Sequence, residues 1–316
     1  MNRMELQFLG TGSGVPAKHR NVSSIAFKLL DEKNAVWLVD CGEATQHQIL
    51  STTLKPRKIE KIFITHMHGD HIFGLPGLLS SRGFQGGDTP LTIYGPKGIK
   101  RYVQSSLSAS HTYLRYPIHF VEIEEDGIIY KDDQFTVSCA RLDHGIRSYG
   151  FRFEEKDHAG TLQSDQLAEM GVPFGPLFGK LKRGETVTLE DGRTINGKDY
   201  IGAAHKGRVV TILGDTKKTA NSVTLAKDAD ILVHESTFIG KDRTIAKDYN
   251  HSTNLEAAET AKEANAKKLL LTHISARYLH NDTKLLEKEA QAVFPNTYVM
   301  SDLQEVDIPL VKTEDI

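Results

Sequence analysis

The segment that decides the fold is Ile59-Glu-Lys-Ile-Phe-Ile-Thr65, followed at once by His66-Met-His-Gly-Asp-His71. The first part is a short apolar run with β-branched side chains, which predicts a buried strand. Four potential metal ligands then fall within six residues, and a helix is expected from Leu75 to Ser80. A strand, a ligand-rich loop and a helix in this order are typical of an α/β enzyme whose site lies at strand ends.

The spacing inside this loop predicts two metal ions. In extended backbone the side chains of His66 and His68 point to the same side. Gly69 lets the chain turn, so that Asp70 and His71 face a second point. Imidazole nitrogens and carboxylate oxygens are the ligands of catalytic zinc, and two-metal sites hold their ions about 3.5–4 Å apart. The alternative is a chance group of histidines in a polar loop, and the density of ligands argues against it.

Three later residues share this placement at the end of a strand-like run. They are His144, Asp215 and His273. Each one alone is more often structural, but together they supply the ligands that the first loop lacks. We therefore expect one zinc ion at His66, His68 and His144, a second at Asp70, His71 and His273, and Asp215 bridging both beside a water or hydroxide.

The composition narrows the class of protein. The chain of 316 residues has a net charge of −2, which excludes a nucleic-acid binder that relies on overall positive charge. Its two cysteines exclude a disulfide scaffold and favour a reducing compartment. No run approaches the roughly 18 apolar residues of a membrane span, and Met1–Gly14 lacks the apolar run of a signal peptide. We expect a soluble, cytoplasmic enzyme without membrane contact or nucleotide cofactor.

The alternation of strands and helices is interrupted once. Residues 154–206 are rich in Gly and Pro, including Gly175-Pro176, and predict an inserted arm within a single domain over residues 1–316. Regular alternation resumes after this arm. A helix is expected over Asn254–Asn265, with Ser252 or Thr253 as its cap.

Taken together, these motifs resemble the metallo-β-lactamase superfamily. The matching segments are Thr65–His71, the isolated His144, Gly214–Thr216 and Thr272–Ser275. The resemblance implies a four-layer αβ/βα sandwich with the metals at one edge of two sheets. It leaves the substrate open, because the superfamily contains β-lactamases, thioesterases, lactonases, oxygen reductases and nucleases.

Further segments are similar to one branch, the short-form ribonuclease Z family. They are the opening Leu9–Pro16, the PxKxRN-like loop Pro16–Asn21, the HEAT-like block Val233–Phe238 with Ser236 in place of Ala, and His251–Thr253. The Gly175-Pro176 arm is similar to the exosite with which that family holds tRNA. The resemblance implies a zinc endonuclease that removes the 3′ trailer of precursor tRNA and acts as a homodimer. The products would be a tRNA 3′-hydroxyl and a trailer 5′-phosphate.

The residues expected to contact RNA are basic, and charge alone does not settle their role. Lys18 and Arg20 are candidates to reach a phosphate near the metals. The alternative is that they lie in an exposed basic loop without a specific role. In the arm, the expected contacts are Gly175, Pro176, Lys180, Lys182 and Arg183. Acidic residues of the same segment make a solvated loop the alternative, and the family likeness favours RNA contact.

The resemblance implies that Asp70 accepts the proton of the attacking water while it also touches metal. His251 is the candidate donor of a proton to the leaving oxygen, with Glu235 as its orienting partner. The main alternative is another hydrolase of this fold, namely a small phosphodiesterase, a lactonase or a thioesterase. A metal-binding or RNA-binding module without catalysis is disfavoured, because all seven expected ligands are present.

Overall fold

The computed structural model describes residues 4–158, 160, 162–202 and 204–310. The chain divides into two compact units. The first contains residues 1–154 and 209–309, and the second contains Glu155–Arg208. Among the described residues, no helix combines the length and the apolar character that crossing a membrane requires.

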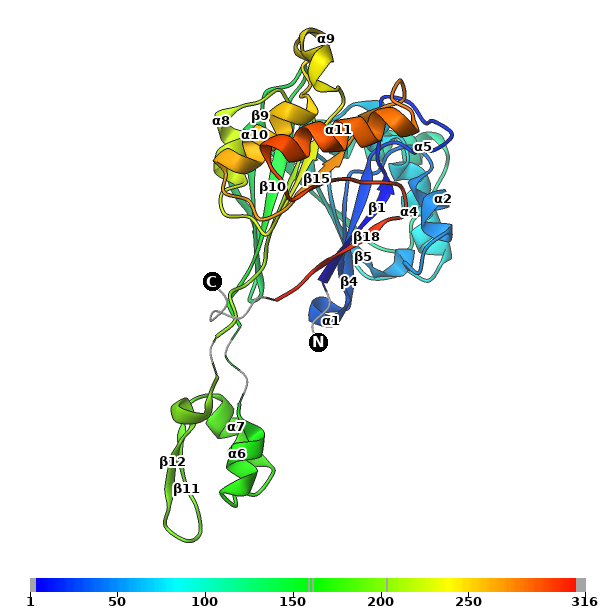
Figure 1. Cartoon of the computed structure of the whole chain (residues 1–316). Helices are drawn as coiled ribbons and strands as arrows, with labels where there is room; N and C mark the ends of the chain where they lie inside the picture. The colour runs from blue at the N-terminus through cyan, green and yellow to red at the C-terminus, as the bar shows by residue number, and fades with distance from the viewer. Residues whose placement is uncertain (1–3, 159, 161, 203, 311–316) are drawn as a thin grey trace. The chain divides into compact units, whose positions relative to one another are not determined.

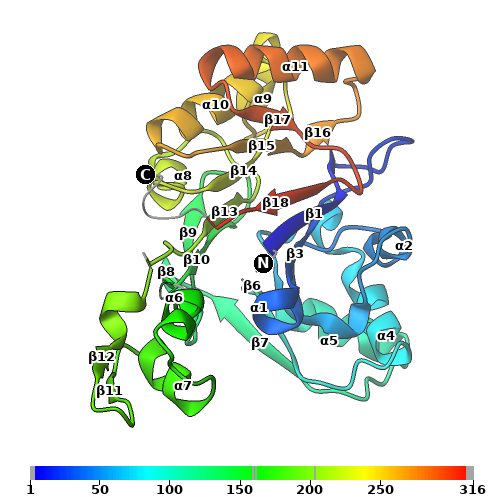
Figure 2. The ribbon, with the colours of Figure 1, turned by 60° about the horizontal axis from the view of Figure 1, so that its bottom comes forward.

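Two seven-stranded mixed sheets form the centre of the first unit (Figures 1 and 2). The first sheet has the order β18 (Glu305–Ile308), β1 (Met4–Gly10), β3 (Ser24–Leu29), β4 (Ala35–Val39), β5 (Ile59–Phe63), β6 (Leu91–Pro96) and β7 (Ile118–Ile123). The second has the order β17 (Thr297–Val299), β15 (Leu269–Thr272), β14 (Ile231–Glu235), β13 (Val209–Leu213), β10 (Ser148–Glu155), β9 (Phe135–Leu142) and β8 (Gly127–Lys131).

The core between the two sheets is aromatic. Trp37 of β4 is fully buried, and its ring lies 5.9 Å from that of Phe63 in the same sheet. From the second sheet, Phe135 and Phe153 approach Trp37 at 5.3 and 6.1 Å between ring centroids. Apolar side chains of both sheets therefore meet in one core, which fixes the sheets face to face.

Helices cover the outer face of each sheet. On the first sheet these are α2 (Thr45–Leu50), α4 (Leu75–Phe84) and α5 (Ile99–Ala109), whose buried residues share one apolar cluster with its strands. On the second sheet these are α8 (Ala220–Leu225), α10 (Asn254–Glu263) and α11 (His280–Val293). The expected four-layer α/β sandwich is confirmed. β1, β3 and β4 are buried along their whole length because the sheet is covered on both faces.

Short elements complete this unit: α1 (Leu30–Lys33), η1 (Pro56–Lys58), α3 (Gly69–Ile72), η3 (Gly240–Asp242), α9 (Arg243–Asp248), and the paired strands β2 (Gly12–Ser13) and β16 (Ile274–Ser275). α10 begins after Thr253, whose side chain forms a capping box with Glu256. This cap is one of the two that the sequence offered.

The second unit interrupts the second sheet between β10 and β13. These strands are antiparallel neighbours, and Glu154 pairs with Val209 at the point where the insertion begins. The unit contains α6 (Ser164–Glu169), α7 (Pro176–Lys182), β11 (Thr186–Thr188), β12 (Thr194–Asn196) and η2 (Gly197–Tyr200). It has its own small apolar cluster, formed by Leu162, Leu167, Val172, Leu181, Val187, Leu189 and Ile195. The insertion is therefore a small folded unit with a core of its own.

Candidate metal centre

The seven expected ligands come from segments that directly follow strands of the two sheets. His66 and His68 lie between β5 and α3, and Asp70 and His71 lie in α3 itself. The other three follow β9, β13 and β15. The structure brings the seven together in two groups, each with its ligand atoms within 4.8 Å of one another: His66, His68, His144 and Asp215 in the first, and Asp70, His71 and His273 in the second.

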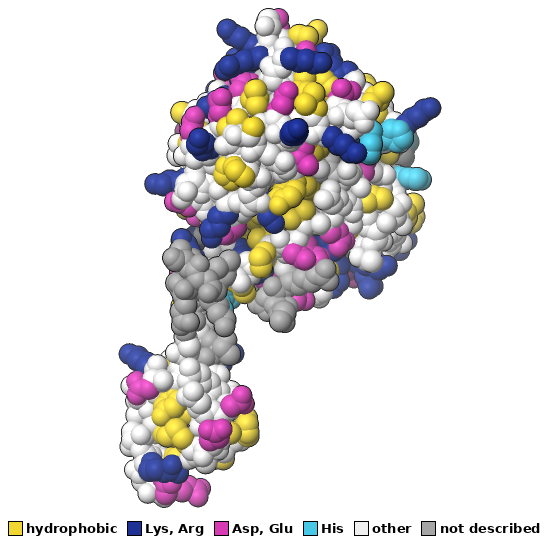
Figure 3. Space-filling model, viewed as in Figure 1, with side chains coloured by type: hydrophobic (Ala, Val, Ile, Leu, Met, Phe, Trp, Pro, Cys, Tyr) yellow, Lys and Arg dark blue, Asp and Glu magenta, His cyan; other side chains and the backbone are white. Residues whose placement is uncertain are grey.

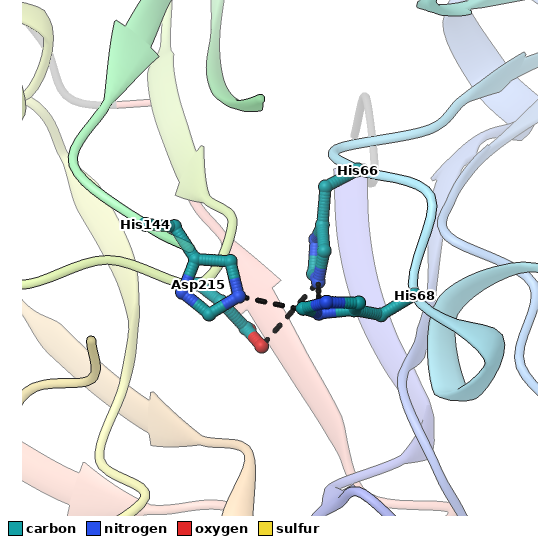
Figure 4. A group of neighbouring side chains, drawn as sticks. All are labelled: His66, His68, His144 and Asp215. Atoms are coloured by element: carbon teal, nitrogen blue, oxygen red, sulfur yellow. Dashed lines mark hydrogen bonds and ion pairs between the residues drawn. The ribbon is translucent and has the colours of Figure 1, made fainter. Parts of the chain in front are cut away.

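In the first group, ring nitrogens converge on one point (Figure 4). His66 Nε2 and His144 Nε2 lie 3.1 and 3.2 Å from His68 Nδ1. The carboxylate of Asp215 approaches His66 Nε2 at 3.5 Å. Burial, and then the neighbouring His71, lower the pKa of His66 well below its ordinary value. Neutral imidazoles that direct lone pairs at a shared point are suited to a divalent cation.

The second group shares a carboxylate with the first. His71 Nε2 and His273 Nε2 are 3.3 Å apart, and His273 Nε2 lies 3.2 Å from Asp70 Oδ2. Asp215 Oδ2 lies 3.5 Å from His71 Nε2 and 3.3 Å from His273 Nε2. The same oxygen that approaches His66 therefore also approaches ligands of the second group. A carboxylate that bridges two metal ions must lie between the two groups of ligands, as Asp215 does.

Asp40 and Thr65 orient two of the rings. His71 Nδ1 lies 2.7 Å from Asp40 Oδ2, which makes that nitrogen the protonated one and leaves Nε2 free to bind a metal. The Thr65 hydroxyl donates to Asp40 at 2.8 Å, so it accepts from His66 Nδ1 at 3.0 Å. One buried carboxylate thus fixes the tautomer of two histidines, directly for His71 and through Thr65 for His66.

Thr237 and Asn250 orient two further rings, those of His273 and His144. The Thr237 hydroxyl donates to Glu235 Oε2 at 2.6 Å and therefore accepts from His273 Nδ1 at 2.8 Å. His144 Nδ1 donates to the backbone carbonyl of Asn250 at 2.8 Å. Sequence reasoning assigned no role to either residue. The position of Thr237, two residues after Glu235, was an available signal, whereas nothing in the sequence indicates the carbonyl contact of Asn250.

His251 lies beside both groups and is paired with Glu235. Its ring is 5.0 Å from that of His144 and 5.4 Å from that of His273. Its Nδ1 lies 2.9 Å from Glu235 Oε1. Burial disfavours the charged imidazolium, but Glu235, together with Asp215 and Asp70, outweighs it and raises the pKa of His251 to about 9. The pair therefore presents a protonated imidazole at neutral pH.

Asp70 is held as a carboxylate. The backbone N–H of Gly14 donates to its Oδ2 at 2.7 Å. Burial favours the neutral acid, but the neighbouring His273 and His71 together outweigh it and lower the pKa of Asp70 far below its ordinary value. Gly14 adopts φ +72°, a conformation that glycine reaches without steric cost. The glycine-rich turn thus brings a backbone donor to a residue of the metal loop.

Comparison with known proteins assigns the family. The family model described as Anti-Pycsar protein Apyc1 matches residues 4–168, about the first half of the chain. A ribonuclease Z of Enterococcus faecalis is 62% identical over 307 residues, which cover 97% of this chain and 98% of that protein. A ribonuclease Z of Latilactobacillus sakei is 61% identical over 306 residues, with 97% and 98% covered. The chain belongs to the ribonuclease Z family.

Solved structures agree with this membership. The short form of human tRNase Z is 29% identical with a TM-score of 0.70, over 97% of this chain and 100% of that one. The metallo-β-lactamase fold protein YhfI of Bacillus subtilis is 20% identical with a TM-score of 0.67, over 97% of this chain and 100% of that one. This likeness supports the fold alone. The metallo-β-lactamase fold expected from the sequence is confirmed.

In this ribonuclease Z family member, two basic residues expected to contact RNA near the centre differ in their surroundings. Lys18 is exposed, whereas Arg20 is half-buried. Arg20 Nη1 donates to Thr11 Oγ1 and to the Met300 carbonyl, both at 2.6 Å. Both residues line a pocket of about 810 Å³. The guanidinium group of Arg20 is therefore engaged in holding the N-terminal loop against the segment after β17.

The remaining expected RNA contacts lie in the second unit. Gly175 has φ +142°, which favours glycine, and Pro176 begins α7. Lys180 and Lys182 follow on the same helix. Arg183, directly after the helix, donates from Nε to Glu185 at 2.6 Å, so its charge is partly neutralised within the unit.

Proposed function

We propose that this chain is an endoribonuclease that removes the 3′ trailer from precursor tRNA. The observation that carries the proposal is the identity of about 60% to ribonuclease Z proteins over nearly the whole chain. The convergence of the seven expected ligands with His251 and Glu235 at one edge of the sheets supports it. A fold alone would leave the chemistry open.

Two zinc ions per chain are the proposed cofactor. The donors fit: three histidines for one ion, two histidines and Asp70 for the other, and Asp215 shared between them. Asp40, Thr65, Thr237 and the Asn250 carbonyl fix the outer ring nitrogens, as zinc-binding histidines require. When bound, zinc would lower the pKa of a water towards neutrality and offset negative charge on the phosphate.

The chain's own residues complete the proposed reaction. Asp70 accepts a proton from the attacking water, whose oxygen forms a bond to phosphorus. The bond from phosphorus to the ribose 3′ oxygen breaks, and this oxygen takes a proton from His251. Glu235 keeps His251 protonated for that step. The products are a tRNA that ends in a 3′-hydroxyl and a trailer that begins with a 5′-phosphate, formed without a nucleotide cofactor.

Substrate positioning is assigned to the inserted arm, residues 154–206, and to the loop with Lys18 and Arg20. The separate core of Glu155–Arg208 supports a binding unit that does not take part in the chemistry. We further propose a C2 homodimer, the commonest closed symmetry, and a cytoplasmic enzyme, since the two free cysteines suit a reducing compartment. Light scattering that finds a monomer at micromolar concentration would contradict the dimer.

One experiment tests the proposed function directly. Purified protein is incubated with a tRNA that carries a 3′ trailer, and both product ends are mapped. The proposal requires cleavage that leaves a 3′-hydroxyl and a 5′-phosphate. A 2′,3′-cyclic phosphate would refute attack by water. Turnover of lactones, thioesters or small phosphodiesters, with intact precursor tRNA, would instead favour the alternative hydrolase.

A further inference from the structure

A second feature of the first unit adjoins the metal centre on the side of His251. A pocket of about 670 Å³ is lined by residues from the β9–β10 loop, the segment after β13, α9 and α10. Its polar walls include Lys217, Lys218, Arg243, Lys247, His251 and Glu256. Four cations therefore meet in the pocket to which the proposed proton donor belongs.

Two of these cations are neutralised by the protein. Lys217 Nζ lies 3.2 Å from Asp143 Oδ2. Lys218 Nζ lies 2.9 Å from Glu259 Oε2 and 2.6 Å from Glu263 Oε1. Lysines paired in this way offer little net charge to a ligand.

Arg243 is anchored but not saturated. Its Nε donates to Glu256 Oε1 at 3.2 Å, and its side chain remains 70% exposed. The other oxygen of Glu256 is held by the N–H and the hydroxyl of Thr253, both at 3.0 Å, so the anchor is itself fixed. Within the described chain, no hydrogen bond or ion pair engages the terminal guanidinium nitrogens. Those nitrogens are suited to bidentate contact with a phosphate.

Lys247 follows Arg243 by four residues on α9, so both lie on one face of the helix and both line the pocket. Lys247 is exposed, and it forms no ion pair with any residue that the structure describes. Figure 3 shows Lys and Arg side chains gathered over the end of the first unit where α9 lies. Tyr249, next to this helix, is also 66% exposed. Exposed cations beside an exposed aromatic ring are typical of nucleic-acid contact.

α9 runs directly into the catalytic segment. His251 donates its backbone N–H to the carbonyl of Ala246 in α9 at 2.8 Å, and Asn250 orients His144. In the proposed reaction, His251 protonates the ribose 3′ oxygen of the last tRNA nucleotide. That nucleotide, and those before it in the same strand, must therefore approach the centre from the side of His251.

We infer that α9 and the adjoining pocket bind phosphates of the tRNA acceptor strand on the 5′ side of the scissile bond, with Arg243 and Lys247 as the contacts. This inference rests on the proposed function and names which part of the substrate lies over which surface. The trailer then leaves across the opposite side of the centre. Because phosphate contacts do not distinguish sequence, the surface serves every tRNA alike.

The test is a double variant, Arg243→Ala/Lys247→Ala, assayed with precursor tRNA over a range of salt concentrations. We expect KM to rise on the order of tenfold with kcat retained. The slope of log K against log salt should flatten by about 2, since each lost phosphate contact removes roughly 0.9. The charge-retaining variant Arg243→Lys/Lys247→Arg should keep the wild-type slope.

Lys97→Ala/Arg101→Ala provides the matched control. These residues are also an exposed lysine and an exposed arginine four positions apart; Lys97 lies just before α5, and Arg101 lies in its first turn. The control should leave KM and the salt slope unchanged. Hydrolysis of bis(p-nitrophenyl) phosphate, which is too small to reach α9, should be the same in the double variant as in the wild type.

Three results would overturn the inference: an unchanged KM and salt slope in the α9 variant, an equal loss in the α5 control, or a loss of small-substrate hydrolysis in the α9 variant. The last would place the effect on the centre itself. Failure of the proposed function looks different, because the wild-type protein would then leave precursor tRNA uncut.

Discussion

The replacement Glu235→Gln separates the charge of Glu235 from its shape. The amide keeps an oxygen that accepts from His251 Nδ1, which lies 2.9 Å from Glu235 Oε1, but it removes the negative charge. Its nitrogen replaces Oε2, the acceptor for the Thr237 hydroxyl, so the zinc content of the variant is measured alongside to report any change at His273. That charge is the main contribution that raises the pKa of His251 to about 9 against the opposing effect of burial. Without it, the pKa should fall to its ordinary value of about 6.5 or below.

The expected effect follows from the protonated fraction. At pH 7.5, an imidazole with a pKa of about 9 is almost wholly protonated, whereas one at about 6.5 is protonated about one time in ten. A proton donor is active while it is protonated, below its pKa, and this activity is lost as the pH rises through that pKa. The cleavage rate of Glu235→Gln should therefore fall about tenfold at pH 7.5 and recover as the pH is lowered towards 6.

Single-turnover cleavage of precursor tRNA, measured from pH 6 to pH 10, is the assay. The wild-type rate should decline near pH 9, and the decline should move to about pH 6.5 or below in Glu235→Gln. His251→Ala provides the comparison, because it should lose about 10²–10⁴-fold in rate and also lose that limb of the profile. A Glu235→Gln profile that still declines near pH 9 would refute the link between the two residues.

Three further predictions concern the metals and the arm. Asp215→Ala should leave fewer than two zinc ions bound, by elemental analysis of the purified protein, because one carboxylate oxygen approaches ligands of both groups. Asp40→Asn should weaken zinc binding about 10–100-fold in a competition titration with a chelator, because the Asp40 carboxylate orients His71. An unchanged zinc affinity would assign Asp40 to folding alone. Replacing residues 155–208 by a two-residue turn should abolish tRNA binding but spare bis(p-nitrophenyl) phosphate hydrolysis, because Glu154 and Val209 remain paired; equal loss of both activities would make the arm part of the core.

The sequence alone predicted the parts of the site that are local. The cluster His66–His71 follows a strand, as expected, and the expected helix does begin at Leu75, whereas the short α3 that holds Asp70 and His71 was not predicted. The strand can be recognised because a buried strand requires a short β-branched apolar run. The helix that begins at Asn254 was also predictable, because Thr253 and Glu256 form a cap that depends only on residues three apart. Both features rest on spacing within one segment.

Only the tertiary structure decided which distant groups meet. His71 and His273 are 202 positions apart, yet their nitrogens are 3.3 Å from each other, because the two sheets pack face to face on an aromatic core. The Asn250 carbonyl that orients His144 could not be predicted, because every residue carries the same carbonyl group. Arg20 likewise turns into the protein, towards Thr11 and Met300, because the direction of a long side chain depends on the partners that packing provides.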